Sequence, residues 1–301
     1  MSASSLAPVA ARKASRPAPR SAANRRARRF VSRGVVVAGL VIFTIWTLAP
    51  ILWAVISSFL PQTALTSTPP DLSPTNLTLD NFQAVLAGDR SLVRGLINSS
   101  IIAVSTSAVA LTLGSLAAYA LARLHVPGSN KILLMILATQ MFPGIVVVIP
   151  LFIVISRLGL IDTYIALIVV YLSFILPIVV WILKGFFEAV PVELERAAAV
   201  DGASVLQTFR LIVLPISLPP LFATGVFAFI ESWNEFFFAV ILTRINVKTA
   251  PIAIAEFSGQ YTTLYGQMVA AAVLASIPVI VLAVVFRQYI LKGFVEGAVK
   301  G

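Results

Sequence analysis

The sequence predicts an all-α membrane protein with six transmembrane helices, and three observations predict it. Of the 301 residues, 59% are hydrophobic and only 11% are charged, whereas soluble globular chains are about 45 to 50% apolar and about 25% charged. The mean hydropathy is +0.97. Six apolar runs are each long enough to cross about 30 Å of hydrocarbon, which takes about 20 helical residues. An ordinary soluble domain is therefore excluded.

The six runs lie near residues 34–58, 96–122, 132–156, 164–186, 218–242 and 267–291. Lipid-facing and bundle-facing sides are both apolar in such helices, so length identifies them better than a 3.6-residue period. Prolines and glycines inside the runs are expected to kink helices and free backbone carbonyls. They are Pro143, Gly144, Pro150, Pro177 and Pro278. Packing irregularity and bending around a pathway explain them equally well.

A basic tail, residues 1–33, precedes the first run. It holds nine of the 22 lysines and arginines and no acidic residue. Alanine, serine, proline and arginine dominate it, so little apolar surface offsets the entropy of ordering, and we expect a disordered tail. A nucleic-acid-binding arm is less favoured, because a membrane span follows directly. A twin-arginine export signal is less favoured because the run is longer than the 7 to 15 apolar residues of a signal peptide.

The basic residues also indicate which side of the membrane each loop occupies. With six spans, 17 of the 22 fall on the side of the N-terminus and five on the other side. Positively charged loops stay in the cytoplasm. The sequence therefore predicts that both termini are cytoplasmic.

The segment between the fourth and fifth runs, residues 187–217, predicts a helix, a glycine turn and a second short helix at the cytoplasmic face. Pro191 suits the first turn of a helix, and Gly202 ends that helix. Ser204 can cap the second helix, which Pro215 is expected to stop. Small side chains on such a surface helix allow another protein to approach closely.

This segment carries a resemblance to a known family. The string ERAAAVDGA at residues 195–203, followed by FRLIVLP at residues 209–215, resembles the cytoplasmic EAA loop of permease subunits in binding-protein-dependent ABC importers. In that family the loop docks on the ATPase subunit and transmits its movement to the spans. The resemblance implies this coupling role for Glu195, Ala197, Ala198, Asp201, Gly202, Ala203, Phe209 and Pro215.

One position departs from the family pattern. The consensus glutamate, six residues before the glycine, falls at Arg196, and the carboxylate is one position earlier, at Glu195. On a helix this shift rotates the charge by about 100°.

Three further stretches narrow the resemblance to carbohydrate importers of the maltose type, and in particular to their MalG-like subunit. They are LTLDNFQAVL (77–86), FIESWNEFFFAVILT (229–243) and KGFVEGAVKG (292–301). The resemblance covers roughly residues 34–301. It implies one transmembrane permease domain over this range, with the type I ABC importer architecture, in a bacterial plasma membrane.

The fifth run contains the only carboxylates inside a predicted span, Glu231 and Glu235, with Asn234 between them and Trp233 beside them. Positions i, i+3 and i+4 share a helix face, which predicts one polar patch. Ionised carboxylates in a bilayer cost about 2.5 kcal/mol or more each, so the patch should face a pathway or a subunit interface. A structural hydrogen-bond network, a sugar-compatible pathway and a proton relay all fit these residues.

The segment 244–266, on the external side, is expected to face the binding protein, as the corresponding loop of the family does. Gln260, Tyr261 and Tyr265 could reach towards a bound sugar. A plain extracellular connector fits the same residues.

Several kinds of chemistry are missing from the sequence. It has no cysteine and one histidine, and it has no GxxxxGK[ST], HExxH or GxSxG motif, so neither an ATP-hydrolysing site, a metal site nor an enzyme is predicted. The resemblance implies that ATP and Mg²⁺ are used by a separate ATPase. The implied partners are a homologous second permease, two ATPase subunits, an extracytoplasmic sugar-binding protein and the lipid bilayer, with no nucleic acid.

Two functions follow from these observations. The first is a permease subunit of an ATP-driven ABC importer for a sugar or oligosaccharide, forming half of the translocation pathway. The alternative is a secondary transporter or channel driven by ion gradients, with Glu231 and Glu235 as the ion-responsive groups. Maltose-like, trehalose-like, other oligosaccharide and glycerol-phosphate substrates all remain open.

Overall fold

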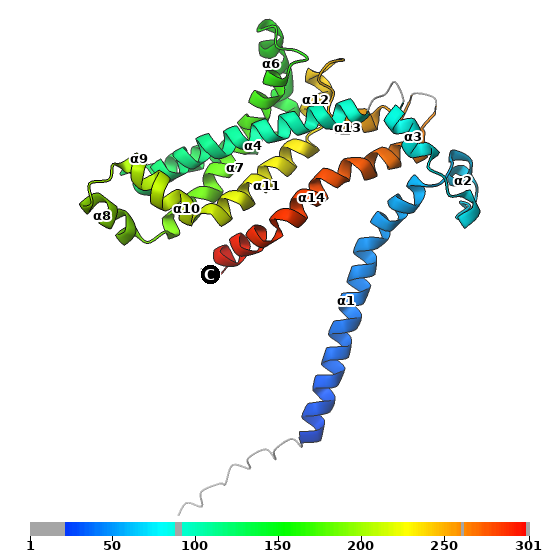
Figure 1. Ribbon diagram of the computed structural model, residues 1–301, viewed down its shortest axis with the longest axis horizontal. Helices are drawn as coiled ribbons and strands as arrows, with labels where there is room; N and C mark the ends of the chain where they lie inside the picture. Colours follow the sequence, from blue (N-terminus) through cyan, green and yellow to red (C-terminus); the bar gives the residue numbers. More distant parts are fainter. Residues whose placement is uncertain (1–21, 88–91, 260–261, 299–301) are drawn as a thin grey trace, which may run out of the picture. The chain divides into compact units, whose positions relative to one another are not determined.

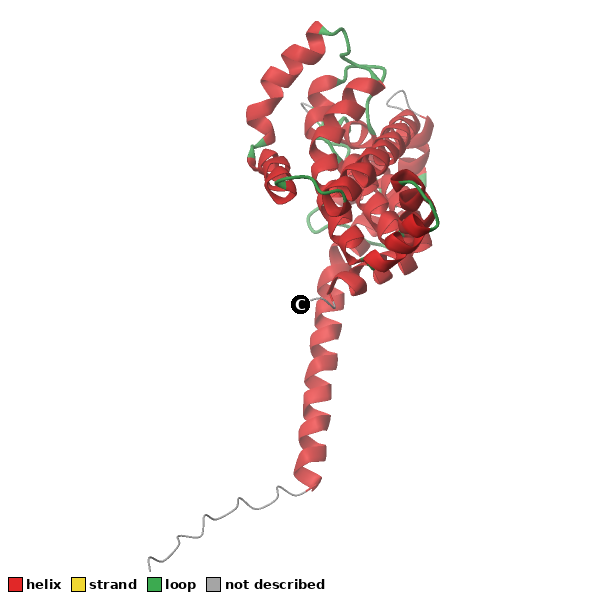
Figure 2. Cartoon of the chain, turned by 90° about the vertical axis from the view of Figure 1, so that its left-hand side faces the viewer, coloured by secondary structure: helices red, strands yellow, loops and turns green. Residues whose placement is uncertain are grey.

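The computed structural model describes residues 22–87, 92–259 and 262–298, and it divides into two units, one up to Trp53 and one from Ala54 onwards. Nearly all of the described residues are in helices or in the loops between them (Figure 2). An isolated bridge between Ser258 and Thr263 is the one β-type pairing in these ranges.

The first helix, α1 (Ala22–Ser58), contains the first predicted span but begins inside the expected tail. Residues 22–33 were expected to be disordered and are helical. Alanine and arginine are strong helix formers, so the apolar helix continues backwards into them. Residues 1–21 of the predicted tail lie outside the described residues.

After the end of α1, the second unit contains further helices and helical turns, of which Figure 1 labels the α-helices except α5. They are α2 (Gln62–Thr66), η1 (Pro74–Asn76), α3 (Asp80–Ala87), α4 (Leu92–Arg123), α5 (Ser129–Ala138), η2 (Thr139–Met141), α6 (Gly144–Arg157), α7 (Tyr164–Ala189), α8 (Val192–Val200), α9 (Val205–Thr208), the π-helical turn η3 (Phe209–Val213), α10 (Leu214–Ile216), α11 (Leu218–Asn234), α12 (Phe237–Leu242), α13 (Ala250–Ala255) and α14 (Tyr265–Ala298).

Four of the predicted spans are continuous helices, and the other two are interrupted. Helices α1, α4, α7 and α14 are each long and apolar enough to cross a membrane, and the described residues hold up to six spans if each bent pair counts as one. Pro177 and Pro278 lie inside continuous helices. The length of the apolar runs therefore located these four helices, whereas the third and fifth runs each fall on more than one helix.

The third predicted span bends by 92° between η2 and α6. Phe142 has an extended backbone and Pro143 caps α6, because a residue that precedes proline disfavours the helical conformation. The fifth predicted span, 218–242, is also interrupted, since α11 ends at Asn234 and α12 begins only at Phe237.

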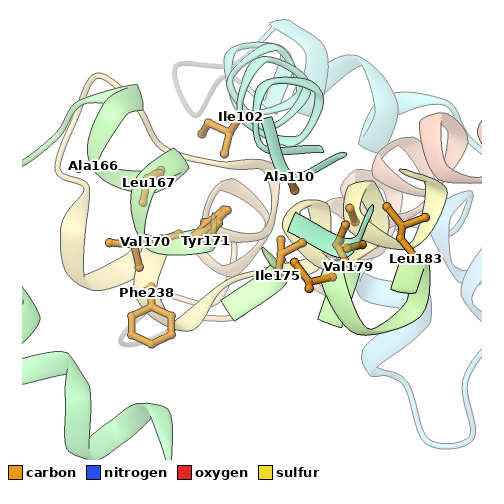
Figure 3. Close-up of a cluster of buried hydrophobic side chains, with 14 of the residues drawn as sticks. Ile102, Ala110, Ala166, Leu167, Val170, Tyr171, Ile175, Val179, Leu183 and Phe238 are labelled. Carbon is orange, nitrogen blue, oxygen red and sulfur yellow. The ribbon is translucent and has the colours of Figure 1, made fainter. Parts of the chain in front are cut away.

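The core of the second unit lies where α4 packs against α7 and α11. An added Cβ on Gly114 of α4 would lie 2.6 Å from Cγ1 of Val179 on α7, and one on Gly225 of α11 would lie 2.9 Å from Cδ1 of Leu111. Glycines at these crossings let the helix backbones approach closely. In Figure 3, side chains from α4, α7 and α12 meet in this core, with Tyr171 and Phe238 among the large ones.

The long helices of the second unit have two distinct ends (Figure 1). Helices α8, α9 and α10 gather at one end, which we call the α8 end. Helices α3 and α13 lie at the other end, which we call the α13 end. Candidate functional residues are found at both ends.

Candidate functional site

The loop that joins α7 to α11 forms the predicted helix, glycine turn and short helix. Pro191 precedes α8, and Gly202 follows it with φ +83°, a conformation that glycine adopts without strain. The Ser204 hydroxyl accepts the N–H of Gln207, and the Gln207 side chain accepts the N–H of Ser204 at 2.7 Å, which makes a capping box. These predictions of helix start and end are confirmed.

Pro215 does not stop the second helix as predicted. It lies inside α10, and the chain turns by 80° only after Ile216, where α11 begins. The π-helical turn η3 directly precedes α10. A π turn shifts the backbone hydrogen-bond register, so the helix accommodates the proline ring.

Glu195 on α8 faces the bundle and contacts two residues of α4. One carboxylate oxygen, Oε1, lies 2.7 Å from Nε of Arg123, and the other, Oε2, accepts the hydroxyl proton of Tyr119 at 2.8 Å. The side chains of Glu195 and Arg123 are only 12% and 14% exposed. Arg123 also donates to the carbonyl of Val190, just before α8. Helix α8 is therefore tied to the last turns of α4.

Three aromatic rings pack together where the second half of the α7–α11 loop meets α4 and α7. Phe209 of η3 lies 4.8 Å from the ring of Tyr119 on α4 and 6.0 Å, edge to face, from Phe187 on α7. The Tyr119 and Phe187 rings are also edge to face, at 6.3 Å. Such pairs contribute about 0.5 to 1.5 kcal/mol beyond the area they bury. The loop is thus anchored on both α4 and α7.

Several apolar side chains of this loop are exposed, and together we call them the α8–α9 surface. It consists of Ala197, Val200, Val205 and Leu206, and Val200 is 88% exposed. Exposed apolar patches on a loop outside the spans are typical of interaction sites. Arg196, at the position of the family's glutamate, is exposed as well.

The other residues predicted for the loop divide by burial. Ala198 and Phe209 are buried and hold the loop together, whereas Ala203 is half-buried. Asp201, Gly202 and Pro215 are exposed.

Sequence reasoning missed Tyr119, Arg123 and Phe187. As a basic residue directly after the second predicted span, Arg123 indicated only a side of the membrane. A usable signal was present, since Tyr119 and Arg123 are four residues apart and therefore share a helix face. Their distance in sequence from Glu195 hid the contact.

The polar patch predicted on the fifth span is divided in the structure. Glu235 is half-buried, has an extended backbone, and accepts the N–H groups of Phe238 and Ala239 at 2.9 and 3.1 Å. It therefore caps α12 and does not continue the helix face of Glu231, which is exposed. The prediction of one shared face was wrong because α11 ends at Asn234.

A cavity of about 560 Å³ lies beside this break, between the end of α11, α13 and α14. Trp233, Asn234 and Phe236 form one wall, and residues of α13 and α14, including Ser276, form the others. Trp233 is otherwise buried against Phe229, with ring centroids 5.5 Å apart. Glu231 and Glu235 do not line the cavity.

The residues predicted to face a binding protein are only partly described. Tyr265 is half-exposed at the start of α14. Gln260 and Tyr261 lie outside the described residues.

Comparison with known proteins identifies the family. Residues 110–295 match the family described as binding-protein-dependent transport system inner membrane component. The chain belongs to this family. It is accordingly a multi-pass permease subunit of the plasma membrane, and its relatives are transport permeases rather than enzymes.

Individual relatives cover most of the permease. The trehalose transport system permease protein SugB of Mycobacterium tuberculosis (strain CDC 1551 / Oshkosh) is 38% identical over 261 residues, 85% of this chain and 93% of SugB. The trehalose/maltose transport system permease protein MalG of Thermococcus litoralis is 36% identical over 275 residues, 90% of this chain and 98% of MalG. The resemblance to the maltose-type permeases is confirmed.

The fold is found in a solved structure of low sequence identity. In a bacterial ABC transporter involved in the import of the acidic polysaccharide alginate, a matching chain has a TM-score of 0.72 at 22% identity, over 88% of this chain and 98% of that chain. The predicted ABC importer permease architecture is therefore confirmed.

Proposed function

We propose that this permease imports a sugar or oligosaccharide, that it forms half of the translocation pathway, and that a separate ATPase drives it through the α8–α9 surface. The named substrates of the two relatives, trehalose and trehalose/maltose, support the substrate class. The distribution of basic residues supports a cytoplasmic location for the α8 end and for both termini.

The observation that carries the coupling role is the attachment of the loop beneath its exposed surface. Glu195 contacts Arg123 and Tyr119, and Phe209 packs on Tyr119 and Phe187. A displacement of α8 therefore pulls directly on the ends of α4 and α7. An ATPase that closes around ATP and Mg²⁺ can use this attachment to change the access of the pathway.

The partners follow from the family and from the exposed surfaces. We propose a homologous second permease, two ATPase subunits that bind the nucleotide, and an extracytoplasmic sugar-binding protein at the α13 end. The cavity beside Trp233 and Asn234 would contribute to the pathway, with flat aromatic surface and amide hydrogen-bonding groups suited to a sugar ring.

The ion-driven alternative requires Glu231 and Glu235 to respond to ions together. The capping hydrogen bonds of Glu235 argue against that role, because a carboxylate that accepts two backbone N–H groups is occupied in holding α12.

The test is to co-express the tagged permease with its proposed partner subunits and to purify it together with whatever binds it. ATP-driven uptake is then measured in proteoliposomes. The ATPase subunit should no longer co-purify with the Leu206→Gln variant, since Leu206 is 65% exposed on the α8–α9 surface. Leu158→Gln is the matched control, because Leu158 is 64% exposed but follows α6, outside the α7–α11 loop. A chain that purifies alone and transports in liposomes without ATP would overturn the proposal.

A further inference from the structure

Asp162, in the short loop between α6 and α7, reaches across to the loop that follows α12. Its own N–H donates to the carbonyl of Leu242 at 2.9 Å. Its carboxylate accepts four consecutive backbone N–H groups, those of residues 244–247, and also the side-chain amide of Asn246 at 2.9 Å. One side chain thus fixes the path of a loop more than 80 residues away in sequence.

The backbone of Asp162 is itself specialised for this contact. Its φ is +62°, and within the described residues it is the one non-glycine residue with a positive φ. Aspartate tolerates this left-handed conformation better than most residues. The unusual conformation and the set of hydrogen bonds occur at the same residue, which points to a functional constraint.

The loop that Asp162 holds, residues 244–249, is called the clamped loop. It also contacts α4, and through Asn98 it is linked to α7. The Asn98 side chain of α4 donates to the carbonyls of Asn246 and Lys248 at 3.1 and 2.8 Å. The Tyr164 hydroxyl at the start of α7 donates to the Asn98 side chain at 2.7 Å. Asn98 is buried, so these bonds are shielded from competing water.

The same loop leads directly into α13, which forms a wall of the cavity. The N–H of Ala250, the first residue of α13, donates to the Ser99 hydroxyl of α4 at 2.8 Å. An added Cβ on Gly95 of α4 would lie 3.1 Å from Cβ of Ala253. Pro251, Ile254 and Ala255 of α13 line the cavity. The position of this wall therefore depends on the clamped loop.

Asp162 stays ionised under ordinary conditions. Partial burial of the carboxylate raises its pKa, but the backbone N–H donors, led by those of Asn246 and Arg244, outweigh burial and lower the pKa to about 2. The negative charge that these donors require is therefore always present at neutral pH.

We propose that Asp162 is the positioning residue for the loop at residues 244–249, at the α13 end, where the binding protein would dock. It holds residues 244–249 and α13 as one preformed unit with the ends of α4 and α7. The extracytoplasmic binding protein then meets a loop that is already ordered, and the cavity wall moves together with α4 and α7. This inference rests on the proposed importer function.

The order of the loop is tested first in the full-length purified chain. Because the sequence has no cysteine, Ile245→Cys gives one labelling site for a nitroxide, and Ile245 is 72% exposed. Asp162→Gly removes the carboxylate while glycine keeps the positive φ without strain. We expect the label to become markedly more mobile in Asp162→Gly.

Asp71 provides the matched control. Its carboxylate also accepts hydrogen bonds in a loop, but only from Ser73 and Asn76 nearby in sequence. Asp71→Gly should leave the label at residue 245 unchanged. A label that stays immobile in Asp162→Gly overturns the proposal.

The second measurement uses the assembled importer with its binding protein. We expect Asp162→Gly to raise the binding-protein concentration that half-stimulates the ATPase by about tenfold, because the loop must then be ordered on binding. Asp162→Asn keeps one acceptor oxygen and should recover part of the loss. A purely structural role would instead lower the amount of complex without moving the half-stimulating concentration.

The outcomes separate the inference from the function on which it rests. Absence of stimulation in the wild-type complex refutes the importer function. Normal stimulation in the wild type together with an unchanged half-stimulating concentration in Asp162→Gly refutes the role of Asp162 alone, whether or not the label becomes mobile.

Discussion

The carboxylate of Glu195 lies 2.7 Å from the guanidinium of Arg123, and this contact joins α8 to the end of α4. A shift of one residue turns a helical side chain by about 100°. The carboxylate at position 195 faces the bundle, and Arg196 takes the exposed position.

Removal of either partner of this contact should destabilise the loop. Because both side chains are largely buried, we expect Glu195→Gln and Arg123→Gln each to cost about 2 kcal/mol. The double variant should cost less than the two single costs together, as in any coupled pair. Thermal unfolding of the four proteins in detergent measures the coupling. The more exposed pair Lys248 and Glu256, whose side chains are 36% and 35% exposed, is the control, and its loss should cost about 1 kcal/mol or less.

The backbone of Gly202 should be essential for coupling. A Cβ at this position meets nothing within 4 Å, so Gly202→Leu introduces only the strain of φ +83°, about 1 to 2 kcal/mol. We expect membrane insertion to be retained while uptake falls and ATP hydrolysis is no longer linked to it.

Gly185→Leu on α7 is the control for that variant, since its Cβ also meets nothing within 4 Å and no positive φ is involved. Uptake and ATPase activity are measured side by side in proteoliposomes. Normal uptake by Gly202→Leu would count against the coupling role of the turn.

The two carboxylates of the fifth span should behave differently. Glu235→Ala removes both capping hydrogen bonds of α12 and should cost about 1 kcal/mol of stability. Glu231→Ala, at an exposed position, should leave the thermal unfolding temperature nearly unchanged. If an ionophore that collapses the proton gradient abolished uptake in the wild type but not in these variants, the ion-driven alternative would be restored.

The pH dependence of the Asp162 clamp follows from its lowered pKa. Because the pKa falls from its ordinary value of 3.8 to about 2 in the folded chain, the clamp contributes fully above about pH 4 and is lost as the pH falls through 2. A nitroxide at residue 245 should therefore remain immobile from pH 8 down to pH 4. Mobility that appears between pH 6 and pH 5 would contradict the assignment.

The spans and the loop were predictable because their signals are local. Apolar length located α1, α4, α7 and α14, and turn chemistry at Pro191, Gly202 and Ser204 located the helices of the loop. The break after Asn234 was not predictable from length, because the apolar residues continue through it. An acidic residue before an apolar run is also a capping signal. At Glu235 the cost of a carboxylate in a bilayer instead favoured a polar patch facing a pathway or an interface.

The sequence by itself determined that this protein is an all-helical membrane permease with a helical loop between the fourth and fifth predicted spans. Hydrophobic length and helix ends depend on neighbouring residues, so they can be read along the chain. Only the tertiary structure decided what the charged side chains do. Tyr119 and Glu195 are 76 residues apart, and Asp162 and Arg244 are 82 residues apart. These contacts exist only because the packing of α4, α7 and α11 brings the residues together. No local sequence pattern encodes a contact between residues so far apart in the chain.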